Sequence, residues 1–477
     1  MNMRFTLIQQ NDTHGCLELH NELFWGTEGP ILKKTGGFSR ISRYIKDLKS
    51  NNDNVLFFDG GDLFHGTLPL VSSKGEAILP ILQKMNLDGF VPGNWDYAYG
   101  KNQLRHLAES LPFPALSCNV TDDDTQEGFF KPYVIKELNG IKIGIIGLTY
   151  PYVDITMPPD FSEGLRFSTG VEDVRKSVEA LEGEADVIVL LSHMGLPLDV
   201  KLVSLVEGID IVLSGHSHDR ITKPIVENGA FIVQAGSSSS FLGRMDVEFE
   251  NGAITDVQYE LVGMEEQLEE DEEIKGMVDE LLSLYQAERT VVIGETETAL
   301  HRMTLEEAPM DKLITDAYLA AFESSAAFSH GWRYGHPIDA GPLTLFDLHT
   351  IIPTNPELFT LDLTGKELWD ALEHNLEQVY SSDPFEQKGG YVLRSSGLKM
   401  TFKPYNPKGH RIQSVNLAGE RIQPEKKYRI VSGGSQSFKK HEDKKTYQNV
   451  RAVDVIHAYL RENGPYKVKS GADVVSV

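Results

Sequence analysis

The sequence predicts an α/β protein with at least two domains, on three observations. In the amino-terminal part, short runs of β-branched and aromatic residues alternate with amphipathic segments, which is typical of strands that alternate with helices. An Asn251-Gly252 pair then separates two strand-like runs and predicts a β-hairpin. Beyond this hairpin the composition changes, first to an acidic helical pattern and then to strands punctuated by glycine and proline.

Composition excludes several classes of protein. The chain has 477 residues with 40% hydrophobic and 24% charged residues, which is typical of globular proteins of two or three domains and not of disordered or fibrous chains. The net charge of −25, without a basic tract, argues against binding to nucleic acid polymers. Because there are only 2 cysteines and no apolar run long enough to span a membrane, we expect a cytoplasmic protein with no membrane partner.

The predicted elements of the first domain follow in order along the chain. The predicted strands are residues 5–8, 55–58, 89–91, 141–148, 187–191 and 209–213. Helical periodicity appears at 39–48 and 75–85, and the run 231–262 predicts consecutive strands that end the domain in antiparallel pairing.

A Glu/Asp-rich segment separates this domain from the rest of the chain. Ile274, Val278 and Leu281 lie at helical spacing within it, which predicts a solvated connecting helix; a surface helix of the first domain is nearly as good an interpretation. Predicted helices at 312–322 and 365–378, followed by short strands, indicate a second α+β domain. We therefore expect domains at 1–262 and 291–477, with an acidic linker helix at 263–290.

Side chains that can bind metal ions follow directly after five of the predicted strands. They are Asp12, His14, Asp62, Asn94, His193, His216 and His218. Residues just past the carboxyl ends of strands meet at one edge of an open α/β sheet, so these distant segments can form one site. Each segment alone is more typical of a turn or a cap, but five in succession predict a metal centre.

The chemistry of these side chains indicates the kind of centre. Carboxylate, amide and imidazole groups suit hard or borderline divalent ions, and no thiolate is among them. Seven donors are too many for one tetrahedral ion but suit two ions that share a carboxylate, the arrangement used for in-line attack on phosphorus. Asp62 is the central candidate for the shared carboxylate.

The order Asp-x-His, Gly-Asp, Gly-Asn, His, Gly-His-x-His resembles the calcineurin-type metallophosphoesterases, and the flanking sequence resembles their 5'-nucleotidase family. The resemblance implies an N-terminal β-sandwich flanked by helices and a C-terminal α+β domain that binds the nucleotide. It also implies two divalent ions, with Mn²⁺ or Zn²⁺ foremost and Fe, Co or Mg as alternatives, and a metal-bridged hydroxide that attacks phosphorus. One ion would take Asp12, His14, Asp62 and His218, and the other Asp62, Asn94, His193 and His216. Asn94 would also stabilise charge on the phosphoryl oxygens.

The sequence departs from the family at the residues that protonate the leaving group. The family has Gly-Asn-His-Glu-Phe-Asp, whereas here Trp95 and Ala98 replace the histidine and the final aspartate. An indole cannot transfer a proton near pH 7, and loss of a general acid typically costs about 10²–10⁴-fold in rate. Candidate replacements are His65, Tyr97 and Tyr99; His65 is equally typical of a hydrogen-bonded loop histidine. The tryptophan also resembles the dimanganese thiosulfohydrolases of the same superfamily.

The second domain retains part of the family's substrate site. Arg333 stands at the position of a phosphate-binding arginine, whose planar fork can hold a phosphate bidentately, although such a residue is also typical of surface ion pairs. Tyr391 is a candidate to stack on the base or to pack in the core. Asn355 and Phe438 are the nearest counterparts of two further substrate contacts.

Together these observations predict a two-metal hydrolase of nucleotides or related phosphate esters and anhydrides. Two alternatives stay open: a nucleotide-binding protein with little turnover, and a thiosulfohydrolase-like enzyme. The expected partner is a small nucleotide or phosphate-ester substrate, and the sequence leaves the oligomeric state, the base preference and the native metal open.

Overall fold

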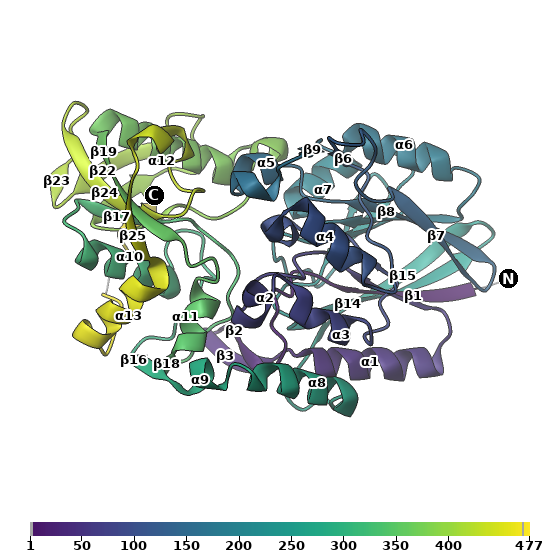
Figure 1. The fold of residues 1–477 in the computed structure, drawn as a ribbon. Helices are drawn as coiled ribbons and strands as arrows, with labels where there is room; N and C mark the ends of the chain where they lie inside the picture. The colour runs from purple at the N-terminus through teal and green to yellow at the C-terminus, as the bar shows by residue number, and fades with distance from the viewer. Residues whose placement is uncertain (1–2, 470–471) are drawn as a thin grey trace. The chain divides into compact units, whose positions relative to one another are not determined.

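The computed structural model describes residues 3–469 and 472–477. It divides into two compact units (Figure 1): unit 1 is Met1–His20 with Lys34–Leu284, and unit 2 is Asn21–Lys33 with Tyr285–Val477. This division differs from the expected boundaries in two places. The acidic helix belongs to unit 1, and a short hairpin from the amino-terminal region belongs to unit 2.

Unit 1 contains two main sheets. The first has the strand order β15-β14-β1-β4-β5 and comprises β1 (Met3–Gln10), β4 (Val55–Asp59), β5 (Gly89–Phe90), β14 (Phe241–Glu250) and β15 (Ala253–Gly263). The second has the order β12-β13-β11-β10-β8-β7 and comprises β7 (Tyr133–Leu138), β8 (Ile141–Leu148), β10 (Val187–Ser192), β11 (Ile211–Ser214), β12 (Ile225–Glu227) and β13 (Ala230–Gln234). A separate two-stranded sheet pairs β6 (Val120–Asp122) with β9 (Leu165–Phe167).

The core of unit 1 lies between the two main sheets. Buried side chains of both sheets form one cluster, for example Phe5, Leu7 and Phe58 of the first sheet with Ile143 and Val189 of the second. Strands β8, β10, β11 and β13 run parallel, and their nearly continuous apolar sequences are typical of strands covered on both faces. The predicted hairpin is confirmed, since Asn251 and Gly252 adopt φ of 53° and 83° between the paired strands β14 and β15.

Helices cover the outer faces of this sandwich. The helices of unit 1 are α1 (Phe38–Asn51), α2 (Leu68–Ser72), α3 (Leu79–Leu82), α4 (Gly100–Glu109), α5 (Val153–Thr156), α6 (Val171–Leu181), α7 (Leu196–Val203) and α8 (Glu272–Ser283). Helix α1 packs against β4, while α6 and α7 pack against β8 and β11 of the other sheet (Figure 1). This confirms the predicted β-sandwich flanked by helices.

The predicted helix at 75–85 is interrupted. A 3-10 turn, Glu76–Ile78, precedes the short α3, in which Pro80 occupies the first turn. Because proline has no backbone N–H to donate, it is tolerated at a helix start and not within a helix. One continuous helix is therefore replaced by two short ones.

The acidic segment packs on α1 rather than standing free. Ile274, Val278 and Leu282 of α8 are buried, and α8 contacts both α1 and α3. At its amino-terminal end Asp271 accepts a hydrogen bond from Ser42 at 2.6 Å and pairs with Lys46 at 2.5 Å. The acidic residues thus complement basic residues of α1. A short α9 (Gln286–Thr290) follows in unit 2.

Unit 2 is an α+β unit, as predicted. Its largest sheet has the order β20-β17-β24-β19-β25 and comprises β17 (Ala326–Ser329), β19 (Glu357–Thr364), β20 (Arg394–Ser396), β24 (Lys427–Gly433) and β25 (Thr446–Arg451). A second sheet comprises β21 (Leu398–Phe402), β22 (Ile412–Leu417), β23 (Glu420–Arg421) and β26 (Val474–Ser476), and two pairs comprise β16 (Val292–Thr296) with β18 (Gly341–Thr344) and β2 (His20–Gly26) with β3 (Gly29–Thr35). Its helices are α10 (Pro309–Ala321), α11 (Leu345–Ile351), α12 (Gly365–Tyr380) and α13 (Ala452–Asn463).

The core of unit 2 joins both of its larger sheets to α12. Phe328, Phe359, Leu372, Val415 and Ile430 are among its buried members. Helix α12 begins with a capping box, in which Thr364 and Glu367 each bond the other's backbone N–H.

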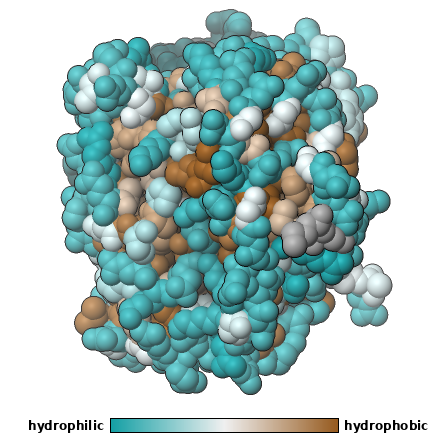
Figure 2. All heavy atoms as spheres, turned by 90° about the vertical axis from the view of Figure 1, so that its right-hand side faces the viewer, coloured by the Kyte–Doolittle hydropathy of each residue, from teal (hydrophilic) through white to brown (hydrophobic). Residues whose placement is uncertain are grey.

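The face of unit 1 drawn in Figure 2 is mainly polar. Figure 2 faces the end of unit 1 that lies at the right in Figure 1 and shows a mainly hydrophilic surface with apolar side chains near the middle of the face. Across the described ranges, none of the helices combines the length and the apolar composition needed to cross a bilayer.

Candidate metal centre

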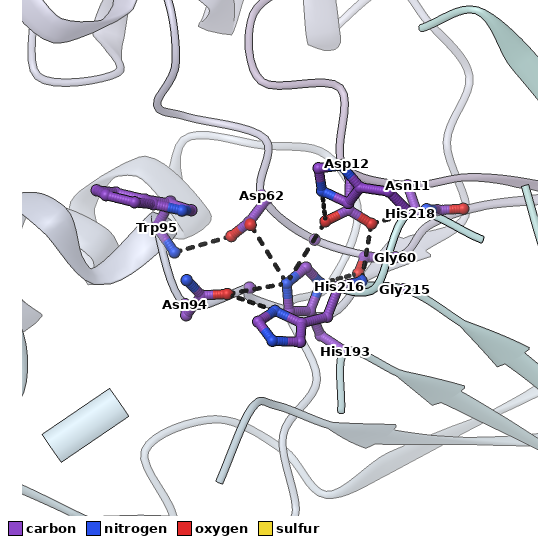
Figure 3. A network of polar contacts seen from close by, with 12 residues as sticks. Asn11, Asp12, Gly60, Asp62, Asn94, Trp95, His193, Gly215, His216 and His218 are labelled. Carbon is purple, nitrogen blue, oxygen red and sulfur yellow. Dashed lines mark hydrogen bonds and ion pairs between the residues drawn. The ribbon is translucent and has the colours of Figure 1, made fainter. Parts of the chain in front are cut away.

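The seven predicted ligands lie in five loops at the carboxyl ends of β1, β4, β5, β10 and β11. Figure 3 labels all of them except His14. Five of them, Asp12, His14, Asp62, His216 and His218, adopt left-handed backbone with φ of 51°, 46°, 58°, 72° and 61°. Non-glycine residues rarely adopt this conformation, and such strained residues cluster at functional sites. The loops therefore hold these side chains at a local conformational cost.

The first group of donors consists of Asp12, His14 and His218. Their ligand atoms all lie within 4.8 Å of one another. His218 Nε2 is 3.1 Å from Asp12 Oδ1, and His14 Nε2 is 3.3 Å from His218 Nε2. Asp12 and His14 are almost fully buried, and His218 is partly exposed. One carboxylate oxygen and two imidazole nitrogens thus face a common point.

The second group consists of Asp62, His193 and His216, all buried and within the same 4.8 Å limit. Asn94 joins this group, because its Oδ1 lies 2.8 Å from His216 Nδ1 and 3.3 Å from His193 Nε2. Tyr150 stacks on the His216 ring at a centroid distance of 4.2 Å. These contacts hold the amide oxygen and the imidazoles on one side of Asp62.

Asp62 lies between the two groups. Its Oδ2 is 3.7 Å from His14 Nε2 of the first group and 3.4 Å from His193 Nε2 of the second. Its other oxygen, Oδ1, accepts the backbone N–H of Trp95 at 2.8 Å. A single carboxylate oxygen therefore faces both groups, as expected of a residue shared by two ions.

The charges of the site fit divalent cations. Burial raises the pKa of Asp12, but His218 and His193 outweigh it, so the pKa falls below its usual range and the carboxylate is ionised. In the described residues, the ion pairs of Asp12 and Asp62 are all with histidines. Burial lowers the pKa of His193, yet Asp62 and Asp12 raise it to about 10. Buried carboxylates that draw protons onto imidazoles indicate a need for positive charge, which bound metal ions would satisfy.

Hydrogen bonds to the ring nitrogens also fit metal binding. His193 Nδ1 donates to the backbone oxygen of Gly60 at 2.5 Å, which leaves Nε2 as the nitrogen that faces Asp62 and Asn94. Metal-binding histidines typically donate their second N–H to a carbonyl or carboxylate in this manner. Burial lowers the pKa of His14 to about 4, so this ring is neutral at pH 7 and can bind a cation.

Several buried residues that support the loops were not identified from the sequence. Asn11 donates to Asp12 Oδ2 at 2.7 Å and accepts from Ala235 N at 3.1 Å. Gln234 donates to the oxygens of Ser214 and Gly215 at 2.8 and 2.7 Å, and so holds the loop that carries His216. The bond between Asn11 and Ala235 joins residues that are 224 positions apart, so no local pattern reveals it.

The structure places the candidate catalytic residue His65 against Trp95. The two rings stack at a centroid distance of 4.6 Å and an interplanar angle of 17°. Burial lowers the pKa of His65 to about 3, so its ring is neutral at pH 7 and is not a general acid there. The hydroxyls of Tyr97 and Tyr99 donate to Thr149 and to the backbone of Leu70, respectively, at 3.3 and 3.1 Å.

Two of the four predicted substrate contacts in unit 2 lie together. The guanidinium of Arg333 is 6.0 Å from the centroid of the Tyr391 ring, and both residues are half-buried. Asn355 instead accepts the backbone N–H of Val453 at 2.9 Å, at the start of α13. Phe438 belongs to the core and packs edge to face on Phe328 at 5.2 Å. The structure thus gives Asn355 and Phe438 contacts within the fold.

Comparisons with known proteins agree with the fold. The calcineurin-like phosphoesterase family matches residues 5–220, and the 5'-nucleotidase C-terminal domain matches residues 288–435. The chain is therefore a calcineurin-like metallophosphoesterase, a class of divalent-metal hydrolases of phosphate esters. Within that class it belongs to the 5'-nucleotidase family, whose substrates are nucleotides.

The relatives of this chain differ in the activities for which they are named. The trifunctional nucleotide phosphoesterase YfkN of Bacillus subtilis is 26% identical over 86% of this chain, which spans only 30% of that protein. The structure resembles the sulfate thiohydrolase SoxB of Thermus thermophilus with a TM-score of 0.91 and 25% identity, covering 99% of this chain and 96% of SoxB. It also has the fold of a 5'-nucleotidase precursor from the same organism, with a TM-score of 0.89 and 24% identity over 100% and 99% of the two chains.

Proposed function

We propose that the chain is a two-metal-dependent hydrolase of nucleotides or related phosphate esters and anhydrides. The observation that carries this proposal is the position of Asp62 Oδ2, which faces His14 of one donor group and His193 of the other. One ion would be held by Asp12, His14, Asp62 and His218, and the second by Asp62, Asn94, His193 and His216. Bound there, two divalent ions, Mn²⁺ or Zn²⁺ foremost, would supply a nucleophile at neutral pH and neutralise phosphoryl charge.

The chain's own residues position the substrate in this proposal. The amide of Asn94 is oriented by His216 on one side and by Met157 Sδ, 3.5 Å from its Nδ2, on the other, and it stabilises charge on the phosphoryl group. In unit 2, Arg333 binds an anionic group of the nucleotide and Tyr391 stacks on the base. The contacts of Asn355 and Phe438 favour structural roles for these two residues. The cytoplasmic location of the protein stays a prediction, with which the two free cysteines are compatible.

The leaving group determines which substrates this site favours. Trp95 cannot transfer a proton, the neutral His65 is not an acid at pH 7, and the hydroxyls of Tyr97 and Tyr99 are bonded elsewhere. Substrates whose leaving group departs without protonation are therefore favoured, such as anhydrides, cyclic phosphodiesters and activated esters. Plain nucleoside monophosphates, which leave as alkoxides, should be poorer.

A substrate panel tests the proposal. Product release is measured with added Mn²⁺ on AMP, UDP-glucose, NAD, 2',3'-cyclic AMP and bis-nitrophenyl phosphate, with Asp62→Ala as the blank. We expect hydrolysis that Asp62→Ala abolishes, faster on the anhydrides and activated diesters than on AMP. Equal rates on AMP and on nitrophenyl esters would refute the leaving-group argument. Tight nucleotide binding with no turnover would favour a binding protein.

A second candidate, a thiosulfohydrolase, is favoured by Trp95 together with the similarity to SoxB. A sulfur leaving group needs no general acid, so the same site would suit it. The test is sulfate release by the Mn²⁺-loaded protein from a carrier protein bearing an S-thiosulfonated cysteine. No sulfate release under conditions that support phosphate ester hydrolysis would remove this candidate.

A further inference from the structure

Asp96 is a buried carboxylate that neither donor group contains. It begins the 3-10 turn Asp96–Tyr99 directly after Trp95, and its side chain has no exposed surface. Among the residues that the structure describes, no lysine or arginine forms an ion pair with Asp96. Instead, the carboxylate accepts hydrogen bonds from four backbone N–H groups.

Three of the four bonds join the loop after β4 to the loop after β5, and the fourth, from Gly93, lies within the loop after β5. Asp96 Oδ2 accepts from the backbone N–H of Asp62 at 2.9 Å and of Gly93 at 2.7 Å. Oδ1 accepts from Leu63 and Phe64, each at 2.8 Å. Three backbone N–H groups of the loop after β4 thus donate to one carboxylate of the loop after β5, and these bonds link the two loops.

These loops carry two of the proposed ligands, Asp62 and Asn94. Asp62 has the unfavourable left-handed φ of 58°, and the bond from its own N–H to Asp96 holds the backbone in that conformation. The backbone N–H of Trp95, one residue before Asp96, fixes the Asp62 side chain through Oδ1. The backbone and the side chain of Asp62 are thus held by two consecutive residues of the neighbouring loop.

We propose that Asp96 is a positioning residue of the metal centre. Its carboxylate fixes Asp62 between the two donor groups and sets the separation between Asp62 and Asn94. This inference rests on the proposed two-metal function, and it assigns Asp96 no contact with substrate or metal.

The number of accepting lone pairs explains why a carboxylate is needed here. Asparagine has one accepting oxygen, so in Asp96→Asn two of the four N–H donors face an NH₂ group that cannot accept. Asp96→Glu keeps both oxygens but moves them by one methylene. We therefore expect Asp96→Asn to disturb both loops strongly and Asp96→Glu to disturb them less.

The test is a calorimetric titration of the metal-free full chain with Mn²⁺, which gives the number of bound ions and their affinities. We expect the wild type to bind two ions. Asp96→Asn should bind the ion at Asp62, Asn94, His193 and His216 about 10- to 100-fold more weakly, the usual effect of removing a partner of a metal ligand. Asp96→Glu should lie between the two proteins.

Asp122→Asn is the matched control, because Asp122 is another buried carboxylate of unit 1, paired with Lys101 at 2.9 Å and Arg105 at 2.6 Å. It should lower thermal stability and leave Mn²⁺ affinity unchanged. Wild-type affinity in Asp96→Asn, or an equal loss in Asp122→Asn, would overturn the positioning role while the two-metal function stands. A wild type that binds fewer than two ions would overturn both. If Asp96→Asn does not fold, unchanged affinity in Asp96→Glu contradicts the inference.

Discussion

Trp95 is the residue that most separates this site from the usual pattern of its family. Its indole stacks on His65 and contacts Phe161 edge to face at 6.0 Å, so aromatic rings occupy the place where a proton donor is expected. The sequence alone revealed the substitution. It did not reveal that His65, the nearest candidate replacement, is buried with its pKa lowered to about 3.

Restoring the missing dyad should therefore change which leaving groups the enzyme tolerates. We expect the double variant Trp95→His/Ala98→Asp to raise turnover of AMP relative to nitrophenyl phosphate by about 10²-fold, the lower range for a general acid. Trp95→Phe, which keeps an aromatic ring without a transferable proton, is the control and should leave the ratio of the two turnover numbers unchanged. An unaltered ratio in the double variant would show that protonation of the leaving group does not limit the rate.

At the level of elements, the loop after β5 needs glycine at position 93. A Cβ there would overlap the carboxylate and backbone of Asp62 and would lie 2.6 Å from His193 Cε1. Real Cβ atoms do not approach so closely, and the groups that would have to move are proposed ligands. The loops after β4 and β5 can therefore approach each other closely only because Gly93 has no side chain.

Alanine at Gly93 should impair the metal centre, whereas alanine at Gly276 should stabilise the fold. Gly93→Ala should weaken Mn²⁺ binding and lower hydrolysis at least tenfold, because it displaces Asp62. Gly276→Ala, at an exposed position within α8 where a Cβ meets nothing within 4 Å, should instead stabilise the protein by about 0.5–1 kcal/mol, since alanine favours helix. Metal titration and urea unfolding measure the two effects. Normal metal affinity in Gly93→Ala would contradict the described loop packing.

The sequence predicted the elements that carry local signals and missed those set by distant contacts. The strands that end in ligand-type residues, and the Asn251-Gly252 hairpin, were identified because periodicity and turn chemistry are local. The break before α3 follows from Pro80, which the periodicity alone did not take into account. The four bonds of Asp96 span up to 34 residues and leave no sequence pattern, so its role emerged only from the fold.

The division of the whole molecule likewise depends on packing. The acidic helix α8 looked like a linker because its sequence is polar, but its buried stripe and the pairing of Asp271 with Lys46 attach it to unit 1. The hairpin residues Asn21–Lys33 precede α1 in the chain yet belong to unit 2. In unit 2, Phe438 matched a stacking residue by its neighbours in sequence, but its left-handed φ of 54° accompanies a position in the core.

Buried histidines make the stability of the whole molecule dependent on pH. Burial lowers the pKa of His20 in unit 1 and of His330 in unit 2 to about 4. Between pH 6.5 and about 4 the unfolded chain binds protons that the folded chain does not. The stability that these neutral rings contribute is therefore present above pH 6.5 and is lost as the pH falls toward 4.

Replacing His20 should flatten this dependence. His20 lies against Ser240 and the backbone oxygen of Glu18, at 3.1 and 2.9 Å. In His20→Gln, which does not titrate, the loss of unfolding free energy between pH 7 and pH 4.5 should be smaller than in the wild type by roughly 2 kcal/mol. Urea unfolding of the metal-free protein, followed by circular dichroism, measures the difference. Equal losses in the two proteins would mean that His20 is not held neutral by burial.

The most direct test of the account is the number of metal ions that one chain binds. After equilibration with Mn²⁺ and removal of free metal, elemental analysis of the wild type and of Asp62→Ala counts the bound ions. Because Asp62 Oδ2 faces both donor groups, we predict two ions per wild-type chain and fewer than one in Asp62→Ala, with hydrolysis lost in parallel. One ion or none in the wild type, or two ions retained in Asp62→Ala, would contradict the two-metal centre on which the proposed function rests.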